Sequence, residues 1–245
     1  MRYLFWGVIS LFLLSGCRLA TDSTCDISQT MSAQGVPDFL NISVIDLGLV
    51  KRSRRATVKI HSVYDDGTQV GTGTLFRHQG KTIVITAAHV VSQEPEDINI
   101  SSGGYDLETE IVYLDEDADL AVLLVTNGIR PHSLCLRSVK SSSLKVGLKT
   151  IYSGYPNNES LLTIKGYISG TLTNGNIYLH SYGWPGASGS AVLDERGNII
   201  GVLSAVSIGQ GIFGMPSVIE DSVIVVPIWK LDMEILEESL NQLDK

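Results

Sequence analysis

The stretch WPGASGS, residues 184–190, sets Trp184 and Pro185 before five residues with almost no side chain and places the hydroxyl of Ser188 in their middle. This composition is typical of a surface turn, because Pro, Gly and Ser favour turns for backbone reasons. It also suits a site where backbone N–H groups must reach a ligand without obstruction. The residues that precede this stretch decide between the two interpretations.

Hydrolysis of an amide requires a nucleophile, a base that takes its proton, a group that orients the base, and donors for the oxyanion. The chain offers a candidate for each role. We expect Ser188 to attack, His89 to act as general base and acid, and Asp119 to orient the imidazole and stabilise the imidazolium. We expect the backbone N–H groups of Gly186 and Ser188 to bind the oxyanion, since a glycine leaves the backbone uncovered.

The order of these residues along the chain excludes two other kinds of hydrolase. About thirty residues separate His89 from Asp119, and about seventy separate Asp119 from Ser188. An α/β-hydrolase places its serine before the acid and the histidine, and a subtilisin-like enzyme places its aspartate first. Ser190 also breaks the Gly-x-Ser-x-Gly pattern of an α/β-hydrolase.

Short strand patterns follow one another through most of the chain. The first half contains ATVKIHSVY (56–64), GTGTLF (71–76), TIVITAAHVV (82–91) and LAVLLV (120–125). In the second half, Asn174-Gly175 separates GYISGTLT from NIYLHSY, a strong hairpin signal because Asn-Gly tolerates a positive φ at both turn positions. This succession predicts an all-β barrel or sandwich. Apolar residues at steps of three and four predict a C-terminal helix over 228–243.

Four segments resemble, in order, the motifs of trypsin-like serine proteases with the chymotrypsin fold, and most closely those of the bacterial Deg/HtrA type. They are GTGTLF, TAAHVV (86–91), DLAVLLV (119–125) and PGASGSAVLDERGNIIGVLSA (185–205), and the resemblance covers about residues 56–232. It implies two antiparallel six-stranded β-barrels over about 51–135 and 136–227, followed by the helix, with the active site between the barrels. About forty residues follow the last motif. These are too few for an added PDZ domain, so none is expected.

The resemblance selects the acid and bears on activation. The family pattern Asp-Leu-Ala-x-Leu picks Asp119 over the nearby Asp115 and Asp117. Ala187 stands where animal digestive members carry the Asp that captures a newly cut N-terminus. We therefore expect activity without such a cleavage, while ordering of a loop by a partner or a substrate stays open.

The resemblance also implies which residues bind the substrate. Tyr182 aligns near the base of the primary specificity pocket. The strand edge that pairs with the substrate backbone aligns with Ser204, Ala205 and Val206. No Asp lies where a pocket for Lys or Arg would need one, so a basic P1 residue is not expected. Val206 stands at a wall position where Gly would leave a deep slot, which favours a small or medium aliphatic P1 residue.

The N-terminus predicts export. Arg2 precedes an apolar run from Tyr3 to Leu14, which is shorter than the ~20 residues that span a bilayer. Its ending, Leu-Ser-Gly-Cys, resembles a bacterial lipobox, in which signal peptidase cuts before the Cys and the thiol of Cys17 carries a diacylglyceryl group. An ordinary signal peptide or a short anchor is the alternative. Arg18 replaces the Asp that retains such lipoproteins on an inner membrane, so the outer membrane is expected in a host with two membranes.

After this signal at 1–17, we expect residues 18–50 to form a tether and residues 51–245 to form the protease domain. The tether segment is rich in Thr, Ser, Asp and Gly and shows no sustained period. Once Cys17 is lipidated, Cys25 and Cys135 remain as an even pair, which can form a disulfide in an oxidising compartment. Two unpaired thiols are the alternative.

The composition argues against other partners. A formal net charge of −8 and a pI near 5.1 leave no basic field for the phosphates of a nucleic acid. We expect no metal and no other cofactor, because the remaining histidines show no paired ligand spacing. These are His61, His78, His132 and His180. The oligomeric state is not predicted.

Together these features predict a membrane-tethered serine endopeptidase that cuts polypeptides outside the cytoplasm and faces the periplasm or the cell exterior. A first alternative is a non-catalytic envelope lipoprotein of the protease fold, which holds a peptide without cutting it. A second alternative is a structural envelope lipoprotein. Replacement of Ser188 by Ala separates these hypotheses.

Overall fold

The computed structural model describes the backbone of residues 38–129, 131–210 and 216–243. Side chains are described for all of these except 38–46, 206–210 and 216–220. The expected export signal, most of the tether, Cys17 and Cys25 lie outside the described residues. Among the residues that are described, no helix combines the length and the apolar character needed to cross a membrane.

The first half of the chain forms an eight-stranded sheet. Its strands are β1 (Thr57–Tyr64), β2 (Gly67–His78), β3 (Lys81–Thr86), β4 (Asp97–Ser102), β5 (Tyr105–Leu107), β6 (Thr109–Asp115), β7 (Leu120–Val125) and β8 (Leu134–Cys135). Seven pair in antiparallel fashion in the order β5-β4-β1-β2-β3-β7-β6, and β8 pairs in parallel with β2. Local turns set this order: Gln79 and Gly80, both with positive φ, join β2 directly to β3.

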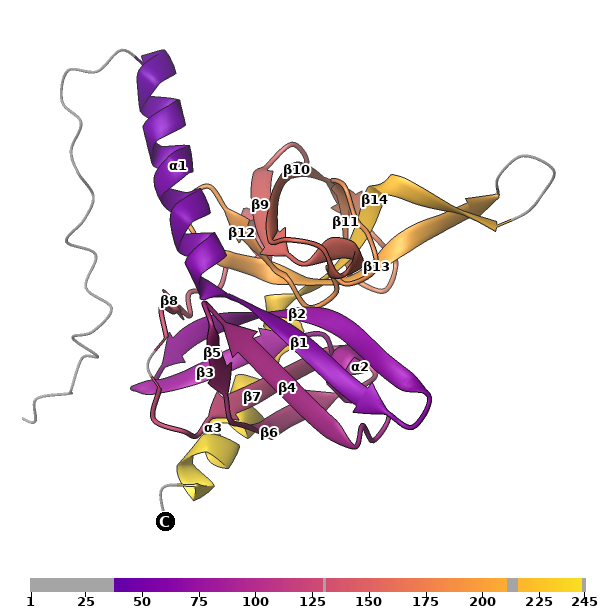
Figure 1. Ribbon diagram of the computed structural model, residues 1–245. Helices are drawn as coiled ribbons and strands as arrows, with labels where there is room; N and C mark the ends of the chain where they lie inside the picture. The colour runs from indigo at the N-terminus through magenta and orange to yellow at the C-terminus, as the bar shows by residue number, and fades with distance from the viewer. Residues whose placement is uncertain (1–37, 130, 211–215, 244–245) are drawn as a thin grey trace, which may run out of the picture.

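The second half forms a closed barrel of six strands in the order β10-β11-β14-β13-β12-β9. The strands are β9 (Lys149–Gly154), β10 (Leu162–Thr171), β11 (Ile177–His180), β12 (Ala191–Asp194), β13 (Ile199–Gln210) and β14 (Pro216–Pro227). Short 3-10 turns lie at η2 (Ser141–Ser143), η3 (Pro156–Asn158) and η5 (Ile228–Lys230). Figure 1 shows this barrel stacked on the first sheet, with β13 and β14 projecting to one side as a long hairpin.

The all-β architecture with a C-terminal helix is confirmed, and one detail differs from the implied pair of six-stranded barrels. The first sheet has eight strands and stays open, because its end strands β5 and β6 are not hydrogen-bonded to each other. These two strands are consecutive, with only Glu108 between them, so the sheet curls until its ends approach.

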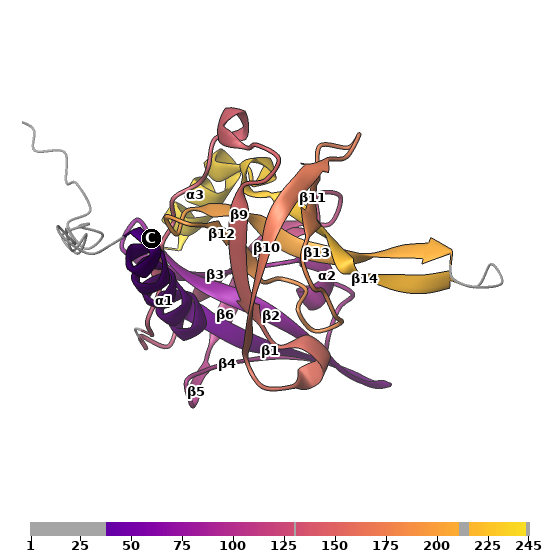
Figure 2. The same cartoon turned by 90° about the horizontal axis from the view of Figure 1, so that it is seen from above.

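Helix α1 (Asp38–Ala56) covers residues 38–50, which the sequence analysis assigned to the tether. Leu49, Ser53 and Ala56 are buried, and the hydroxyl groups of Ser53 and Ser153 lie 2.8 Å apart. The helix thereby packs beside β9, at the edge of the molecule opposite the long hairpin (Figures 1 and 2). A serine takes the middle place of this buried stripe, so the apolar period that would predict a helix is absent from the sequence.

Helix α3 (Met233–Gln242) returns the chain from the second barrel to the first sheet. It lies within the predicted range 228–243 but begins later, because Asp232 caps it by accepting from the N–H groups of Glu234 and Ile235. Leu236 and Leu240 are fully buried against the first sheet.

Two hydrophobic clusters make up the core, one inside the second barrel and one between the first sheet, the helices and the outer side of that barrel. Strand β12 serves both, because successive side chains of a strand point to opposite faces. Ala191 and Leu193 face the shared cluster, whereas Val192 faces the barrel interior. The two halves are therefore joined by apolar packing directly after the WPGASGS stretch.

Candidate active site

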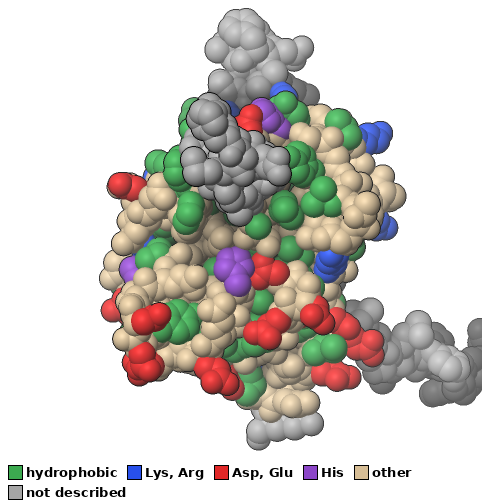
Figure 3. All heavy atoms as spheres, turned by 90° about the vertical axis from the view of Figure 1, so that its right-hand side faces the viewer, with side chains coloured by type: hydrophobic (Ala, Val, Ile, Leu, Met, Phe, Trp, Pro, Cys, Tyr) green, Lys and Arg blue, Asp and Glu red, His purple; other side chains and the backbone are tan. Residues whose placement is uncertain are grey.

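His89 is presented by α2 (Ala88–Val91), a single helical turn that follows β3. Ala88, Val90 and Val91 are buried and anchor this turn in the core. The side chain of His89 is 37% exposed, so it faces the surface between the two halves of the molecule. Figure 3 shows this face, where a histidine side chain and an adjacent acidic side chain lie at the middle.

Asp119 lies in the tight turn between β6 and β7, with a φ of +58° that Asp tolerates better than most residues. Its carboxylate accepts from the backbone N–H of His89 at 3.0 Å and lies 2.9 and 3.0 Å from Nδ1 of the imidazole. The hydroxyl of Ser204 also donates to this carboxylate. Burial alone would raise the pKa of Asp119, but the hydrogen bonds from His89 and Ser204 outweigh it and hold the pKa below its usual range.

The two other aspartates near this position in the sequence, Asp115 and Asp117, have different surroundings. Asp115 accepts from the N–H of Ala118 at 2.8 Å and thereby builds the turn. Asp117 is exposed to solvent. Among these three residues, Asp119 is the one whose carboxylate contacts His89.

Residues 184–190, called the nucleophile turn after the role expected of Ser188, consist of two consecutive β-turns that share Ala187. The N–H of Ala187 donates to Trp184 O at 3.0 Å, and the N–H of Ser190 donates to Ala187 O at 3.1 Å. The third residue of each turn is a glycine with positive φ: Gly186 at +92° and Gly189 at +89°. The stretch is therefore a turn, and its two glycines leave the backbone uncovered at these positions.

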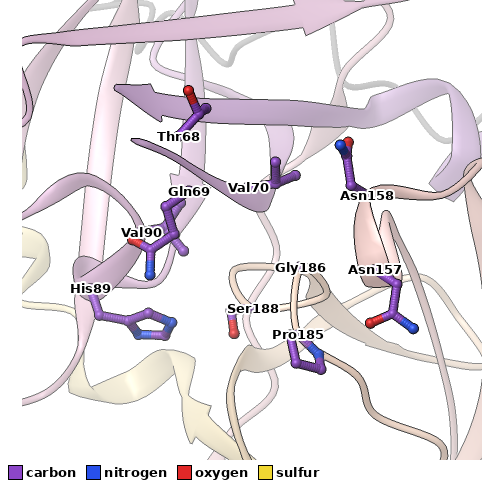
Figure 4. Close-up of a pocket in the computed structure, with 10 residues that line it drawn as sticks. All are labelled: Thr68, Gln69, Val70, His89, Val90, Asn157, Asn158, Pro185, Gly186 and Ser188. Atoms are coloured by element: carbon purple, nitrogen blue, oxygen red, sulfur yellow. The ribbon is translucent and has the colours of Figure 1, made fainter. Parts of the chain in front are cut away.

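Ser188 and His89 line one pocket of about 350 Å³ between the two halves. Figure 4 shows the imidazole of His89 directed toward the side of Ser188, with Pro185 and Gly186 beyond the hydroxyl. The hydroxyl of Ser188 itself donates to the backbone carbonyl of Ser204 at 3.3 Å, a long hydrogen bond. Among the backbone hydrogen bonds between described residues, none uses the N–H of Gly186 or of Ser188 as donor.

The pocket has a polar wall that the sequence analysis missed. Gln69 from β2 lines it on the side of His89, and the consecutive residues Asn157 and Asn158 in η3 line the far side (Figure 4). The φ values of Asn157 and Asn158 are +53° and +59°. Consecutive asparagines after a proline are the one signal in the sequence for this conformation, because Asn enters the left-handed region more readily than most residues.

The residues expected to bind substrate fall outside this pocket. Tyr182 is 50% exposed, its ring lies 6.3 Å from that of Trp184, and its carbonyl accepts from the hydroxyl of Tyr152. Burial raises the pKa of that Tyr152 hydroxyl. Ala205 is partly buried, and the side chain of Val206 lies outside the described ones.

Ser204, Ala205 and Val206 do lie on a strand with a free edge. On one side Ala205 pairs with Ile224 of β14. On the other side, β12 pairs with β13 only as far as Val202. The next residue, Leu203, is still occupied on that side, since its N–H donates to Ser190 O at 2.9 Å and its carbonyl accepts from the N–H of Gly189 at 2.7 Å. Beyond Leu203, none of the described strands pairs with that side of β13, so an extended peptide can add there.

Two further expectations concern cysteines and metals. Cys135 is disulfide-bonded. Because Cys25 lies outside the described residues, its pairing with Cys135 stays a prediction. Within the part of the chain that the structure describes, no three His, Cys, Asp or Glu side chains gather as a metal site requires.

Comparisons with known proteins agree on the architecture. Residues 71–202 match the family profile described as "Trypsin-like peptidase domain". Among solved structures, the active form of the Rv3671c protease from M. tuberculosis is similar with a TM-score of 0.61 and 20% identity, over 77% of this chain and 83% of that one. A serine endoprotease from Yersinia pestis gives 0.64 and 21%, over 84% and 68% of the chains. The HtrA-type protease AlgW, solved with a tripeptide, gives 0.63 and 22%, over 78% and 62%. No curated protein sequence matches the chain.

Proposed function

The chain belongs to the trypsin-like peptidase family, as its motifs predicted, and we propose that it is an exported serine endopeptidase whose nucleophile is Ser188. One observation carries the proposal. His89 comes from the first sheet and Ser188 from the second barrel, yet both line one pocket, and His89 is hydrogen-bonded to Asp119. The motifs for these residues are far apart in the sequence, so their meeting supports a shared role.

In the proposed reaction, Asp119 accepts a hydrogen bond from Nδ1 of His89, which leaves Nε2 free to take the proton of Ser188. To react, the hydroxyl of Ser188 must give up its hydrogen bond to the backbone carbonyl of Ser204, which costs little free energy because this hydrogen bond is long. Its oxygen then attacks the carbonyl carbon of the substrate peptide. The imidazolium then protonates the leaving amine, and water hydrolyses the acyl-enzyme with His89 again as base. The N–H groups of Gly186 and Ser188 stabilise the oxyanion at both stages.

The proposed substrates are polypeptides in an extended conformation. The free edge of β13 beyond Leu203 supports this, since it offers backbone hydrogen bonds to a peptide whatever its side chains are. Selectivity at P1 is proposed to be for small or medium aliphatic residues, with basic residues excluded because Tyr182 takes the place of an acid. A peptide library cleaved only after Lys or Arg would overturn this part.

Covalent labelling tests the proposed chemistry. A fluorophosphonate should label the wild-type protein on Ser188, and Ser188→Ala should abolish labelling and reduce peptide turnover by several orders of magnitude. At most a ~10³- to 10⁴-fold acceleration over water should remain. Peptide binding, measured separately by fluorescence anisotropy, should be kept.

A second candidate is a lipoprotein that binds peptides without cutting them. It is favoured by one observation, that the hydroxyl of Ser188 donates to Ser204 O. If the wild-type protein binds peptides but neither labels nor cleaves, this second function is the correct one.

Export and lipid attachment at Cys17 are proposed from the sequence alone, with the domain facing the periplasm or the cell exterior. Metabolic labelling with a radioactive fatty acid should mark the wild-type protein and leave Cys17→Ser unmarked. Recovery of both proteins in the cytosolic fraction would overturn this part and leave the proposed chemistry untouched.

A further inference from the structure

Successive peptide groups of the nucleophile turn are held by hydrogen bonds to their carbonyl oxygens. The carbonyl of Pro185 accepts from the backbone N–H of Asn157 at 2.6 Å. The next carbonyl, that of Gly186, accepts from Oγ1 of Thr72 at 2.7 Å. Neither donor belongs to the turn, so its conformation depends on two other segments of the molecule.

The third carbonyl, that of Ala187, accepts from the N–H and the hydroxyl of Ser190 at 3.1 and 2.7 Å. In a trans peptide the N–H points away from the C=O of the same plane. With the carbonyl of Pro185 held, the N–H of Gly186 must point to the opposite side. The same holds for the N–H of Ser188, whose peptide plane contains the carbonyl of Ala187.

The middle peptide, between Gly186 and Ala187, sets the angle between these two N–H groups. The carbonyl of this peptide is held by the first sheet, because its donor Thr72 lies in β2 and is fully buried. The hydroxyl of Thr72 donates to Gly186 O and accepts from the N–H of Tyr155 at 3.0 Å. The N–H of Thr72 donates to Ser188 O at 2.8 Å.

This hold matters because Gly186 is the most easily rotated residue of the turn. Its φ of +92° is open to glycine at low cost, but glycine enters other regions as readily. A side chain cannot be used to restrict it, since a Cβ there would lie 2.5 Å from Tyr155 O. Inside the turn, the N–H of Ala187 holds one end of the middle peptide by donating to Trp184 O at 3.0 Å. The hold on its carbonyl end comes from outside the turn, from Thr72.

We propose that Thr72 is a positioning residue for the oxyanion hole. Its hydroxyl, itself oriented by the N–H of Tyr155, fixes the carbonyl of Gly186 so that the N–H groups of Gly186 and Ser188 converge on the oxyanion. The two halves of the molecule are thereby coupled, since the N–H groups of Gly186 and Ser188 are aligned only while the nucleophile turn is packed against β2. This inference rests on the proposed hydrolytic function and adds a residue to it.

The test uses the full-length protein and the rate of fluorophosphonate labelling. Thr72→Val keeps the shape of the side chain but removes the hydroxyl, and it should slow labelling by about 10- to 100-fold, below the 10²- to 10³-fold cost of losing a whole oxyanion donor. Thr72→Ser keeps the hydroxyl and should label within about threefold of wild type. The pH midpoint of labelling should be the same in all three proteins, because the His89–Asp119 pair is untouched.

Thr74→Val is the matched control. Thr74 lies in the same strand, is also buried, and its hydroxyl accepts from the N–H of Ala191 across the same interface at 3.2 Å, without contact to the oxyanion donors. It should lower the melting temperature about as much as Thr72→Val but label within about threefold of wild type. Equal labelling of Thr72→Val and Thr74→Val would overturn the proposal. Wild-type protein that does not label at all would instead overturn the proposed function.

If Thr72→Val does not fold, the hold on Pro185 provides the test. Asn157 has a φ of +53°, which glycine adopts freely and valine strains against. Asn157→Gly and Asn157→Val both remove the amide from the pocket, but only the valine variant should displace the N–H that holds the carbonyl of Pro185. Labelling at least tenfold slower in Asn157→Val than in Asn157→Gly supports the proposal, and equal rates contradict it.

Discussion

Replacing Gly189 by Ala should displace the nucleophile turn from β2, because the structure leaves no room for a methyl group at this position. A Cβ at this position would lie 1.9 Å from Thr72 O and 2.2 Å from the hydroxyl of Thr86. That carbonyl cannot withdraw, since it lies in the middle of the first sheet and accepts from Thr86 at 2.7 Å. The turn must therefore retreat by about 1.6 Å to reach the ~3.5 Å separation of non-bonded atoms.

Two effects add up in this variant. A positive φ in a residue with a Cβ costs about 1–2 kcal/mol, and overpacking costs about 1–3 kcal/mol more. Gly175→Ala isolates the first effect, because Gly175 has a φ of +82° and its Cβ would meet only Lys230 Cε at 4.0 Å. The free energy of unfolding in urea should fall by about 1–3 kcal/mol more for Gly189→Ala than for Gly175→Ala.

Activity should separate the two variants further. A displacement of about 1 Å in a reacting group costs roughly 100-fold in rate, so Gly189→Ala should label with a fluorophosphonate at least 100-fold more slowly than wild type. Gly175→Ala should label at the wild-type rate. Two variants of equal stability, within about 0.5 kcal/mol, would refute the steric reasoning, as would rapid labelling of Gly189→Ala.

Three other predictions concern stability, each measured by urea unfolding. Leu240→Ala should lower the free energy of unfolding by about 2–5 kcal/mol because Leu240 is fully buried, whereas Ile235→Ala, at a side chain 51% exposed, should change it by less than about 0.5 kcal/mol. Asp119→Asn should destabilise at pH 7, and its difference from wild type should shrink as the pH falls below about 3.9: the folded state lowers the pKa of Asp119, so its carboxylate stabilises the fold above the unfolded pKa and loses this effect as the pH falls through the folded value. His132 is exposed, but partial loss of its hydration, with help from Arg55 and Arg52, lowers its pKa; the unfolded chain therefore binds the extra proton first, and stability should fall slightly as the pH drops below about 6.5. His132→Gln should flatten this slope, and an unchanged slope would contradict the assignment.

The sequence was informative where a residue acts through its own chemistry or its own turn. His89, Asp119 and Ser188 stand in motifs whose order and spacing predicted the family. In the structure His89 and Ser188 line one pocket, and Asp119 contacts His89. Hairpin signals such as Asn174-Gly175 predicted strands because turn geometry is local. The sequence alone therefore predicted both the family and the fold class.

What the sequence did not reveal depends on contacts between distant segments. Ser204 was predicted as a substrate-binding residue, and nothing near it in the chain shows that its hydroxyl contacts Asp119. Thr72 looked like one residue of a strand, yet its hydroxyl reaches Gly186, 114 residues away. Helix α1 was missed because its buried stripe includes the polar Ser53, whose partner Ser153 lies 100 residues further on.

The path of the chain after the second barrel has a consequence for biogenesis. Helix α3 is translated later than every strand, but the surface that Leu236 and Leu240 cover belongs to the sheet made earliest. A nascent chain consequently exposes the apolar surface of its first sheet until α3 has been synthesised. The core of the first sheet is therefore completed only after α3 has been synthesised.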